Sequence, residues 1–329
     1  MKLTDEAITI SRADWDEKES SWDYQTSPLI LYKDESGEIE KAYKAWEKKK
    51  AVDFSRIKEI EEQMNKMFNE IYGLHNEISP EISPESITIR IPTATMAVKE
   101  LISYAVGCMF GRFSLEEDGL IYAGGKWSDV KYEKYVPDED AIIPICDDEY
   151  FEDDIVGRFV EFIRAAFGEN KLEENLRFIA DALGGKGAAR DVIRNYFIND
   201  FYADHLKVYQ KRPIYWLFDS GRKNGFKCLV YMHRYQPDMI ARIRTDYVHE
   251  QQARYRTAIE ETANRIESAS GSDKVKFTKR LNTLKAQNDE IHAYEEKIHH
   301  LADQMICIDI DDGVKKNYEI FKDVLAKIK

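Results

Sequence analysis

The chain has 329 residues, of which 43% are hydrophobic and 33% are charged, and its formal net charge is −13 at pH 7. The length exceeds that of one average domain, and the hydrophobic fraction is sufficient for an extensive core. The strongly negative total argues against a protein that coats nucleic acid non-specifically.

The four cysteines argue against two further classes of protein. Cys108, Cys146, Cys228 and Cys307 are far apart and form no Cys-x-x-Cys pair, so neither a structural zinc site nor a dense disulfide framework is expected. The amino terminus carries no apolar run like that of a signal peptide, and no segment is long enough to span a bilayer. We therefore expect a cytoplasmic protein with reduced, buried thiols and no membrane partner.

Charge is distributed unevenly along the chain. Residues 129–181 contain 16 acidic and 6 basic residues, whereas residues 200–256 contain 6 acidic and 11 basic residues. This polarity is compatible with one face that binds a polyanion and another that repels it.

The amino-terminal part is predicted to combine a strand with a long helical segment. Ile8 and Ile10 indicate a short strand, whereas apolar residues recur with a helical period over residues 38–72, and Gly73 suits a helix C-cap. Residues 77–85 contain two Ser-Pro pairs, which favour extended backbone and mark the clearest linker.

The segment after this linker is predicted to be mixed. Residues 87–91 alternate between isoleucine and polar residues as in a strand, and Thr95 is placed to cap a helix that ends near Ala105. Residues 107–127 are rich in glycine and aromatic residues, which favours an irregular, β-rich segment with exposed turns. Apolar spacing then predicts helices at residues 155–167, 172–183 and 189–209.

A β-hairpin at residues 211–235 is the predicted centre of the fold. Two extended apolar runs, 214–218 and 226–232, flank a turn that contains Asn-Gly, which supplies the positive φ that a tight hairpin needs. A rigid ribbon with cations at its edge is suited to a phosphate backbone. The alternative is a core hairpin with a solvated basic turn. The cations at the turn and at the outer ends of the two strands are Lys211, Arg212, Arg222, Lys223 and Arg234.

Long helices are predicted beyond residue 237. Two amphipathic helices flank a break at residues 270–273, and the apolar residues of 277–308 are spaced by threes and fours, as in a coiled-coil seam. The short connection favours an antiparallel helical hairpin within one chain. A turn at residues 309–313 precedes a final helix.

Two motifs suggest phosphate or metal chemistry. Residues 184–187, Gly-Gly-Lys-Gly, precede a helix, so their amides are placed to hold a phosphate unless they form a plain inter-helix turn. Asp138 with Glu169 and Lys171 imitates the carboxylates and lysine of a Mg²⁺-dependent nuclease. Glu169 lies between helical segments, however, whereas such nucleases need it on a strand.

Cations next to aromatic residues are the most coherent functional signal. Arginine pairs with guanine or phosphate, and aromatic rings stack on bases, although most buried aromatic residues serve packing. The candidate DNA-binding residues are Arg112, Lys126, Trp127, Arg212, Arg222, Lys223 and Arg234.

Several blocks of sequence resemble one protein family. They closely resemble the C-terminal portion of the PglX family, the adenine-specific DNA methyltransferases of BREX phage-defence systems, and the resemblance covers nearly the whole chain. The blocks are residues 20–24, 107–125, 137–162, 173–187, 199–235 and 308–319.

The resemblance implies a non-catalytic part of such an enzyme. This part contributes target recognition and a helical clamp on DNA, while another part flips and N6-methylates the adenine. The chain lacks the family's Asn/Asp-Pro-Pro-Tyr/Phe motif and its glycine-containing loop for S-adenosylmethionine. We therefore expect no catalytic residue, cofactor or metal here, and S-adenosylmethionine in the absent catalytic portion. Double-stranded DNA is the expected partner, and other BREX proteins and a phage inhibitor are further candidates.

The expected fold is α+β and helix-rich, with a small mixed β region and a central hairpin, flanked by long helices that include an antiparallel coiled-coil hairpin. Three units are expected: residues 1–78 with a strand and a long helical segment, residues 79–236 with a mixed, target-recognition-like region, and residues 237–329 with the helical hairpin and a final helix. Two other functions stay open, namely a coiled-coil scaffold for other defence proteins and a metal-dependent nuclease centred on Asp138.

Overall fold

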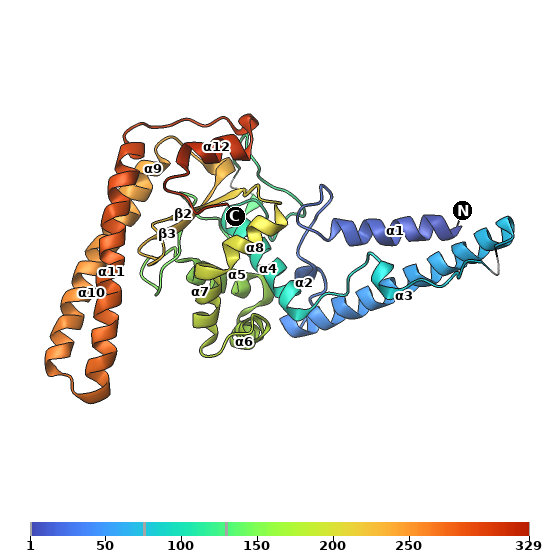
Figure 1. The fold of residues 1–329 in the computed structure, drawn as a ribbon, viewed down its shortest axis with the longest axis horizontal. Helices are drawn as coiled ribbons and strands as arrows, with labels where there is room; N and C mark the ends of the chain where they lie inside the picture. Colours follow the sequence, from blue (N-terminus) through green and yellow to red (C-terminus); the bar gives the residue numbers. More distant parts are fainter. Residues whose placement is uncertain (1, 75–76, 129–130, 329) are drawn as a thin grey trace.

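The chain folds into a central body from which two long helical arms extend (Figure 1). The computed structural model describes residues 2–74, 77–128 and 131–328. Helices dominate and one small antiparallel sheet lies in the body, which confirms the expected helix-rich α+β class. Over the described ranges, no helix combines the length and the apolar character needed to cross a membrane.

The sheet contains the predicted hairpin and one strand that was not predicted. β2 (Tyr215–Asp219) and β3 (Lys227–Tyr231) pair antiparallel, and β1 (Ile142–Pro144) adds to the other edge of β3, so the order is β1-β3-β2. Ile143 and Leu217 both lie opposite Leu229. Nearly every strand residue is buried, because helices and the carboxyl-terminal segment cover the sheet.

Five of the described helices form the body around this sheet. Thr93 accepts a hydrogen bond from the amide of Met96 at 3.2 Å and caps the first of them, two residues before the predicted cap. The single helix predicted for residues 189–209 is wrong: the chain breaks at Asp200, where the turn lets aromatic residues of the two halves pack together. The five are α4 (Ala94–Met109), α5 (Ile155–Phe167), α6 (Leu172–Ala182), α7 (Ala189–Asn199) and α8 (Phe201–Val208).

The amino-terminal arm consists of α1 (Lys2–Asp16) packed on α3 (Ile39–Tyr72). The strand predicted at Ile8 and Ile10 is wrong, because Leu3, Ala7 and Ile10 recur with a helical period and are half-buried. The long helix is confirmed, and Gly73 ends it with a φ of 72° as predicted. Ion pairs hold the arm together, including Arg56 with Glu6 at 2.6 Å.

Residues 77–91 run back along α3. Ile87 and Ile89 are buried against Ile57 in a small separate cluster. The strand predicted for residues 87–91 is wrong, because this extended segment packs its side chains on a helix and pairs with no described strand. Residues 107–127, all of which the structure describes, also contain no strand: residues 107–109 end α4, and residues 110–127 form turns and irregular segments.

The second arm is the predicted antiparallel helical hairpin. One continuous helix is formed by α9 (Met239–Arg242), a π-turn η5 (Ile243–Val248) and α10 (His249–Ser268), and α11 (Gly271–Ala302) returns beside it (Figure 1). Coiled-coil packing of this seam stays a prediction. The chain ends with η6 (Ile310–Asp312) and α12 (Val314–Phe321), and Leu325 then forms an isolated antiparallel bridge with Phe218 of β2.

One core joins most of the chain. Buried residues from Tyr24 to Leu325 belong to it, so it draws on all three predicted units, whose boundaries stay a prediction. Three cysteines are buried as expected, whereas Cys307 is exposed because it lies in the surface segment after α11. The remaining short elements are α2 (Pro28–Leu31), η1 (Pro84–Ser86), η3 (Glu169–Lys171) and η4 (Met232–Arg234).

Candidate nucleic-acid interface

The turn of the β2–β3 hairpin presents two of the predicted cations to solvent. The side chains of Arg222 and Lys223 are exposed, and neither has an ion-pair partner among the residues that the structure describes. Asn224 carries a positive φ of 55°, as the tight turn requires. The predicted display of cations at the hairpin tip is therefore present in the fold.

A carboxylate of α11 fastens this turn. Glu290 accepts hydrogen bonds from the Ser220 hydroxyl at 2.9 Å, from the Lys223 amide at 2.8 Å and from the Gly225 amide at 3.0 Å. A Cβ built on Gly225 would lie 2.6 Å from the carbonyl oxygen of Gln287. Glycine is therefore needed at position 225 for close approach to α11, whereas Asn224 supplies the positive φ.

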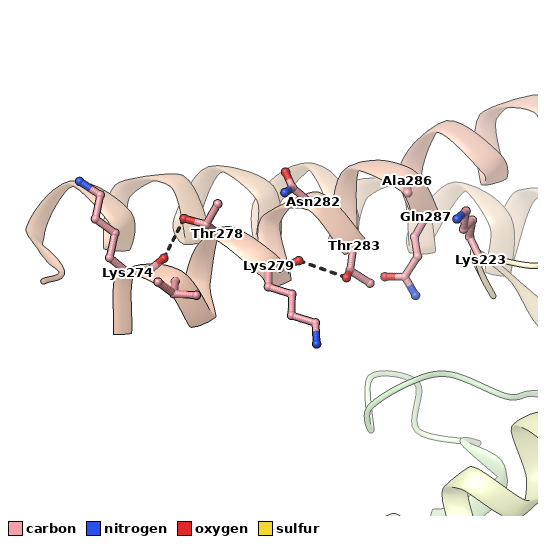
Figure 2. Close-up of a pocket in the computed structure, with 9 residues that line it drawn as sticks. Lys223, Lys274, Thr278, Lys279, Asn282, Thr283, Ala286 and Gln287 are labelled. Carbon is pink, nitrogen blue, oxygen red and sulfur yellow. Dashed lines mark hydrogen bonds between the residues drawn. The ribbon is translucent and has the colours of Figure 1, made fainter. Parts of the chain in front are cut away.

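A basic groove lies where this turn meets α11. This open groove has a volume of about 590 Å³, and Lys223 lies at one end while Lys274 and Lys279 project from the helix (Figure 2). The hydroxyls of Thr278 and Thr283 donate to carbonyls of their own helix, at 2.7 and 3.1 Å. The lysines therefore supply the charge of the groove wall.

Sequence reasoning missed the α11 lysines. Residues 277–308 were interpreted only as an apolar packing seam. Residues 274–288, however, contain five basic residues and no acidic one. In a chain with a net charge of −13, such a run was a visible signal. Its position beside the hairpin turn was not visible, because the two segments are far apart in sequence.

Arg112 is held inside the body. It donates to the hydroxyl of Tyr231 at 3.2 Å, and its guanidinium lies 5.2 Å from the ring centre of Phe113 and 6.0 Å from that of Tyr209. In this arrangement the side chain joins aromatic residues of the core. A DNA contact by Arg112 stays a prediction.

Two of the predicted DNA-binding residues, Arg234 and Trp127, contact each other, a pairing that the sequence did not predict. The guanidinium of Arg234 lies 4.2 Å from the indole centre, and it donates to the carbonyls of Asp138 at 2.6 Å and Glu139 at 2.9 Å. Trp127 also stacks on Tyr132 at 5.1 Å. Both side chains are thus engaged within the protein.

The other two predicted residues are at the surface. The side chains of Lys126 and Arg212 are exposed, on the loop before Trp127 and on the segment between α8 and β2, respectively. The structure therefore brings Arg222 and Lys223 together at one turn and Arg234 and Trp127 at another place. A role in DNA binding stays a prediction for each of them.

An acidic cluster lies near Arg234. Carboxylate oxygens of Asp138, Asp140 and Asp153 lie within 4.8 Å of one another, and the Tyr247 hydroxyl donates to Asp153 at 2.6 Å. Burial and the neighbouring Asp140 carboxylate raise the pKa of Asp138 to about 8. This raised pKa favours proton binding by Asp138, which lowers the negative charge of the cluster.

The nuclease-like residues are not arranged as that hypothesis requires. Glu169 pairs with Arg164, and Lys171 pairs with Glu174 at 2.7 Å and with Glu38. Both therefore have partners other than the cluster around Asp138. Nothing in this geometry assembles the lysine and carboxylates needed to activate water.

The Gly-Gly-Lys-Gly turn serves the helices around it. The amides of Gly184 and Gly185 donate to the carbonyls of Asp181 and Ala180, at 3.0 and 3.3 Å. A Cβ on Gly185 would lie 2.2 Å from the Val192 side chain. The amides of Gly184 and Gly185 are thus already used, which favours the plain turn over the phosphate site.

Two known proteins match this chain. It is 40% identical over 326 residues to the adenine-specific methyltransferase PglX of Lacticaseibacillus casei (strain Zhang), a match that covers 97% of this chain and 27% of that protein. It is 37% identical over 358 residues to the adenine-specific methyltransferase BrxX of Escherichia coli O9:H4 (strain HS), with 99% and 29% covered. No family model matches the chain. The expected resemblance to a portion of such methyltransferases is confirmed, and the chain spans less than a third of their length.

Proposed function

We propose that this chain is the DNA-recognising and DNA-clamping part of an adenine-specific (N6) DNA methyltransferase of a BREX phage-defence system, without catalysis of its own. The observation that carries the proposal is the match of nearly the whole chain to a portion of two adenine-specific methyltransferases. Adenine methylation requires a flipped base and a bound methyl donor. The chain lacks the Asn/Asp-Pro-Pro-Tyr/Phe motif of that chemistry, so the proposal places the reaction in another part of the protein.

The surface features of the chain support a role in holding DNA. Phosphate contacts by lysine and arginine position a protein on a duplex, and sequence is read separately at base edges. The exposed cations Arg222 and Lys223 stand on a rigid turn beside a lysine-lined groove. The two helical arms extend from the body (Figure 1), and this geometry suits a clamp more than an enclosed catalytic cleft.

S-adenosylmethionine does not fit this groove. A nucleoside needs a carboxylate for its ribose hydroxyls in the common cofactor-binding folds. The described lining of the groove is lysine, threonine, asparagine, glutamine, valine and alanine, without any carboxylate. We propose that the cofactor binds with the reaction, in another portion of such a methyltransferase.

The proposal is tested by titrating fluorescently labelled duplex DNA with the 329-residue chain and recording anisotropy over a salt series. We expect binding that weakens steeply with salt, with a slope of about −0.9 in log K against log salt for each phosphate bound. A single-stranded oligonucleotide of the same sequence is the matched control, because a clamp for a duplex prefers the duplex. Absence of binding at low salt, or affinity that does not change with salt, would refute the proposal.

A second candidate function is an interaction scaffold that binds other defence proteins or a phage inhibitor through the α10–α11 hairpin. The observation that favours it is the projection of this hairpin from the body (Figure 1) in a chain with a net charge of −13. A pull-down of BREX proteins with the full chain and with a chain lacking residues 250–300 separates the two functions. If partners stay bound without the hairpin while DNA binding is lost, the scaffold hypothesis fails.

A further inference from the structure

We propose that the hairpin turn of residues 220–225 and the amino-terminal half of α11 form one composite surface that binds the sugar-phosphate backbone of duplex DNA. Lys223, Lys274 and Lys279 supply its charges, and Glu290 is the positioning residue that holds the turn against the helix. The partner follows from the proposed function, whereas the surface and the roles of its residues follow from the geometry.

The charge of this surface contrasts with that of the whole chain. Residues 274–288 carry five basic residues and no acidic one, while the chain carries 61 acidic residues against 48 lysines and arginines. Lys274 also lies in the first turns of α11, where the positive end of the helix dipole adds to the potential. A local concentration of positive charge attracts a polyanion even when the total charge is negative.

The lysines of the groove are not neutralised by the protein. Within the described ranges, no carboxylate lies within ion-pair distance of Lys223, Lys274 or Lys279. Arg280 shows the contrast on the same helix, since it pairs with Asp147 at 3.0 Å and lies 4.0 Å from Asp148. The protein therefore pairs a cation next to the groove and leaves the groove lysines free.

The two halves of the surface are fastened to each other. Besides the three hydrogen bonds to Glu290, the carbonyl of Gly225 accepts a hydrogen bond from the buried Tyr255 hydroxyl of α10 at 2.9 Å, and the carbonyl of Asn224 accepts one from Gln287 at 3.4 Å. A Cβ on Gly221 would lie 2.7 Å from Glu290. Hydrogen bonds thus fix the turn that carries Lys223 to the helices beside it. Such fixed geometry lowers the entropic cost of binding a phosphate backbone.

The chemistry of the groove fits phosphate more than bases or a small molecule. Lysine binds phosphate as a point charge without the fork geometry that reads guanine. The threonine hydroxyls that line the groove already donate to their own helix, so these protons are not available to read base edges. Small-molecule pockets enclose most of their ligand, whereas this groove is open and three of its lining residues are lysines (Figure 2). We therefore expect contacts that position DNA irrespective of its sequence.

The first experiment compares two triple variants with equal loss of charge. The groove variant is Lys223→Gln, Lys274→Gln, Lys279→Gln, and the control variant neutralises three exposed lysines that also lack ion-pair partners in the described structure, namely Lys48→Gln, Lys66→Gln and Lys297→Gln. Binding of the full chain to several unrelated duplexes is measured over a salt series, and far-UV circular dichroism verifies the fold of each variant.

The groove variant should bind all duplexes about tenfold or more weakly near 0.1 M salt, and its salt slope should be shallower by up to about 2.7, at about 0.9 for each phosphate that the variant no longer neutralises. The control variant should retain the slope of the parent chain. If the parent binds and the two variants behave alike, the composite surface is refuted while the DNA-binding function stands. If the parent itself does not bind a duplex at low salt, both are refuted.

Poly-L-glutamate provides a separate probe for an acidic protein partner. If the groove variant loses poly-L-glutamate binding while its DNA binding is unchanged, the surface recognises acidic protein and the proposal is overturned. If DNA binding falls in the groove variant and not in the control variant, the proposal is supported, whatever the result with poly-L-glutamate.

Glu290→Gln tests the positioning role because charge and geometry predict opposite results. Removal of a negative charge near the lysines would by electrostatics alone strengthen DNA binding. Loss of an acceptor that holds the turn should instead weaken binding two- to tenfold, without the change of salt slope seen in the groove variant. Stronger binding by Glu290→Gln would overturn the positioning role.

Discussion

The buried ion pair between Arg194 and Asp154 leads to the most direct stability prediction. The two terminal nitrogens of the Arg194 guanidinium each donate to one carboxylate oxygen of Asp154 at 2.8 Å, and Nη1 also donates to the carbonyl of Cys146 at 2.9 Å. The side chains are only 10% and 1% exposed. Asp154 in addition caps α5 by accepting from the amide of Val156 at 3.0 Å. The pair thus joins α7, the start of α5 and the segment after β1.

Replacement of Arg194 by methionine keeps the aliphatic volume but leaves the Asp154 carboxylate buried without its partner. Removal of one member of a buried pair costs about 3–5 kcal/mol, because the remaining charge is neither solvated nor paired. Arg190 on the same helix is the matched control. It makes a similar two-pronged contact with Glu173, at 2.9 and 2.7 Å, but those side chains are 44% and 69% exposed. Arg190→Met should therefore cost only about 0–1 kcal/mol.

The assay is equilibrium urea unfolding followed by tryptophan fluorescence, with both variants and the parent chain under the same conditions. A third variant, Arg194→Met with Asp154→Asn, removes the stranded charge and should recover part of the stability, since the effects of contacting residues are not additive. The reasoning is refuted if Arg194→Met costs no more than Arg190→Met. It is also refuted if the double variant is less stable than Arg194→Met alone.

Three further changes test other parts of the structure. Gly225→Ala should destabilise the fold by about 1–3 kcal/mol, because the added carbon would lie 2.6 Å from the Gln287 carbonyl oxygen. The control is Gly157→Ala in the same urea assay. Its new carbon meets nothing closer than 3.6 Å, so this change should be neutral or stabilising by about 0.4–1 kcal/mol. Burial and a neighbouring carboxylate raise the pKa of Asp138 to about 8. The contribution of the protonated carboxyl to folding stability is therefore complete below about pH 4 and is lost as pH rises through 8. Asp138→Asn should melt at a higher temperature than the parent at pH 9, and an equal or lower melting temperature would contradict the raised pKa. Burial and the neighbouring Arg112 guanidinium lower the pKa of His205 to about 3. The contribution of its neutral ring to folding stability is therefore lost as pH falls from about 6.5 through 3. The difference in unfolding free energy between the parent and His205→Gln should shrink from pH 7 to pH 4, and a constant difference would refute the assignment.

The local sequence was sufficient to predict the secondary-structure elements that have a regular apolar spacing or a characteristic turn. The long helix that ends at Gly73, the hairpin around Asn224 and the return helix α11 were all predicted, because their apolar spacing and turn chemistry do not depend on distant neighbours. The elements predicted wrongly or missed are those decided by a partner. Residues 2–16 form a helix against α3, and β1 exists because β3 offers an edge to it.

The candidate site shows the same division. Arg222 and Lys223 were predicted from the polar tip of a hairpin, and the structure leaves them exposed. Arg112 and Arg234 belong to the same class of residue in sequence, yet both are engaged within the fold. Arg112 contacts aromatic rings and the Tyr231 hydroxyl, and Arg234 contacts the Trp127 ring and two backbone carbonyls. Whether a cation next to an aromatic residue faces solvent depends on what the rest of the chain places beside it, and spacing carries no information on that.

The sequence by itself determined the helix-rich class, the central hairpin, the antiparallel helical arm and the resemblance to adenine-specific methyltransferases. Those properties reside in periodicity, turn residues and long blocks of identity, which are local in the chain. Only the tertiary structure decided that Lys223 lines the same groove as Lys274 and Lys279, and that Glu290 fastens the turn that carries Lys223. Charge acts through distance in space, so the groove exists only once α11 has folded back against the sheet.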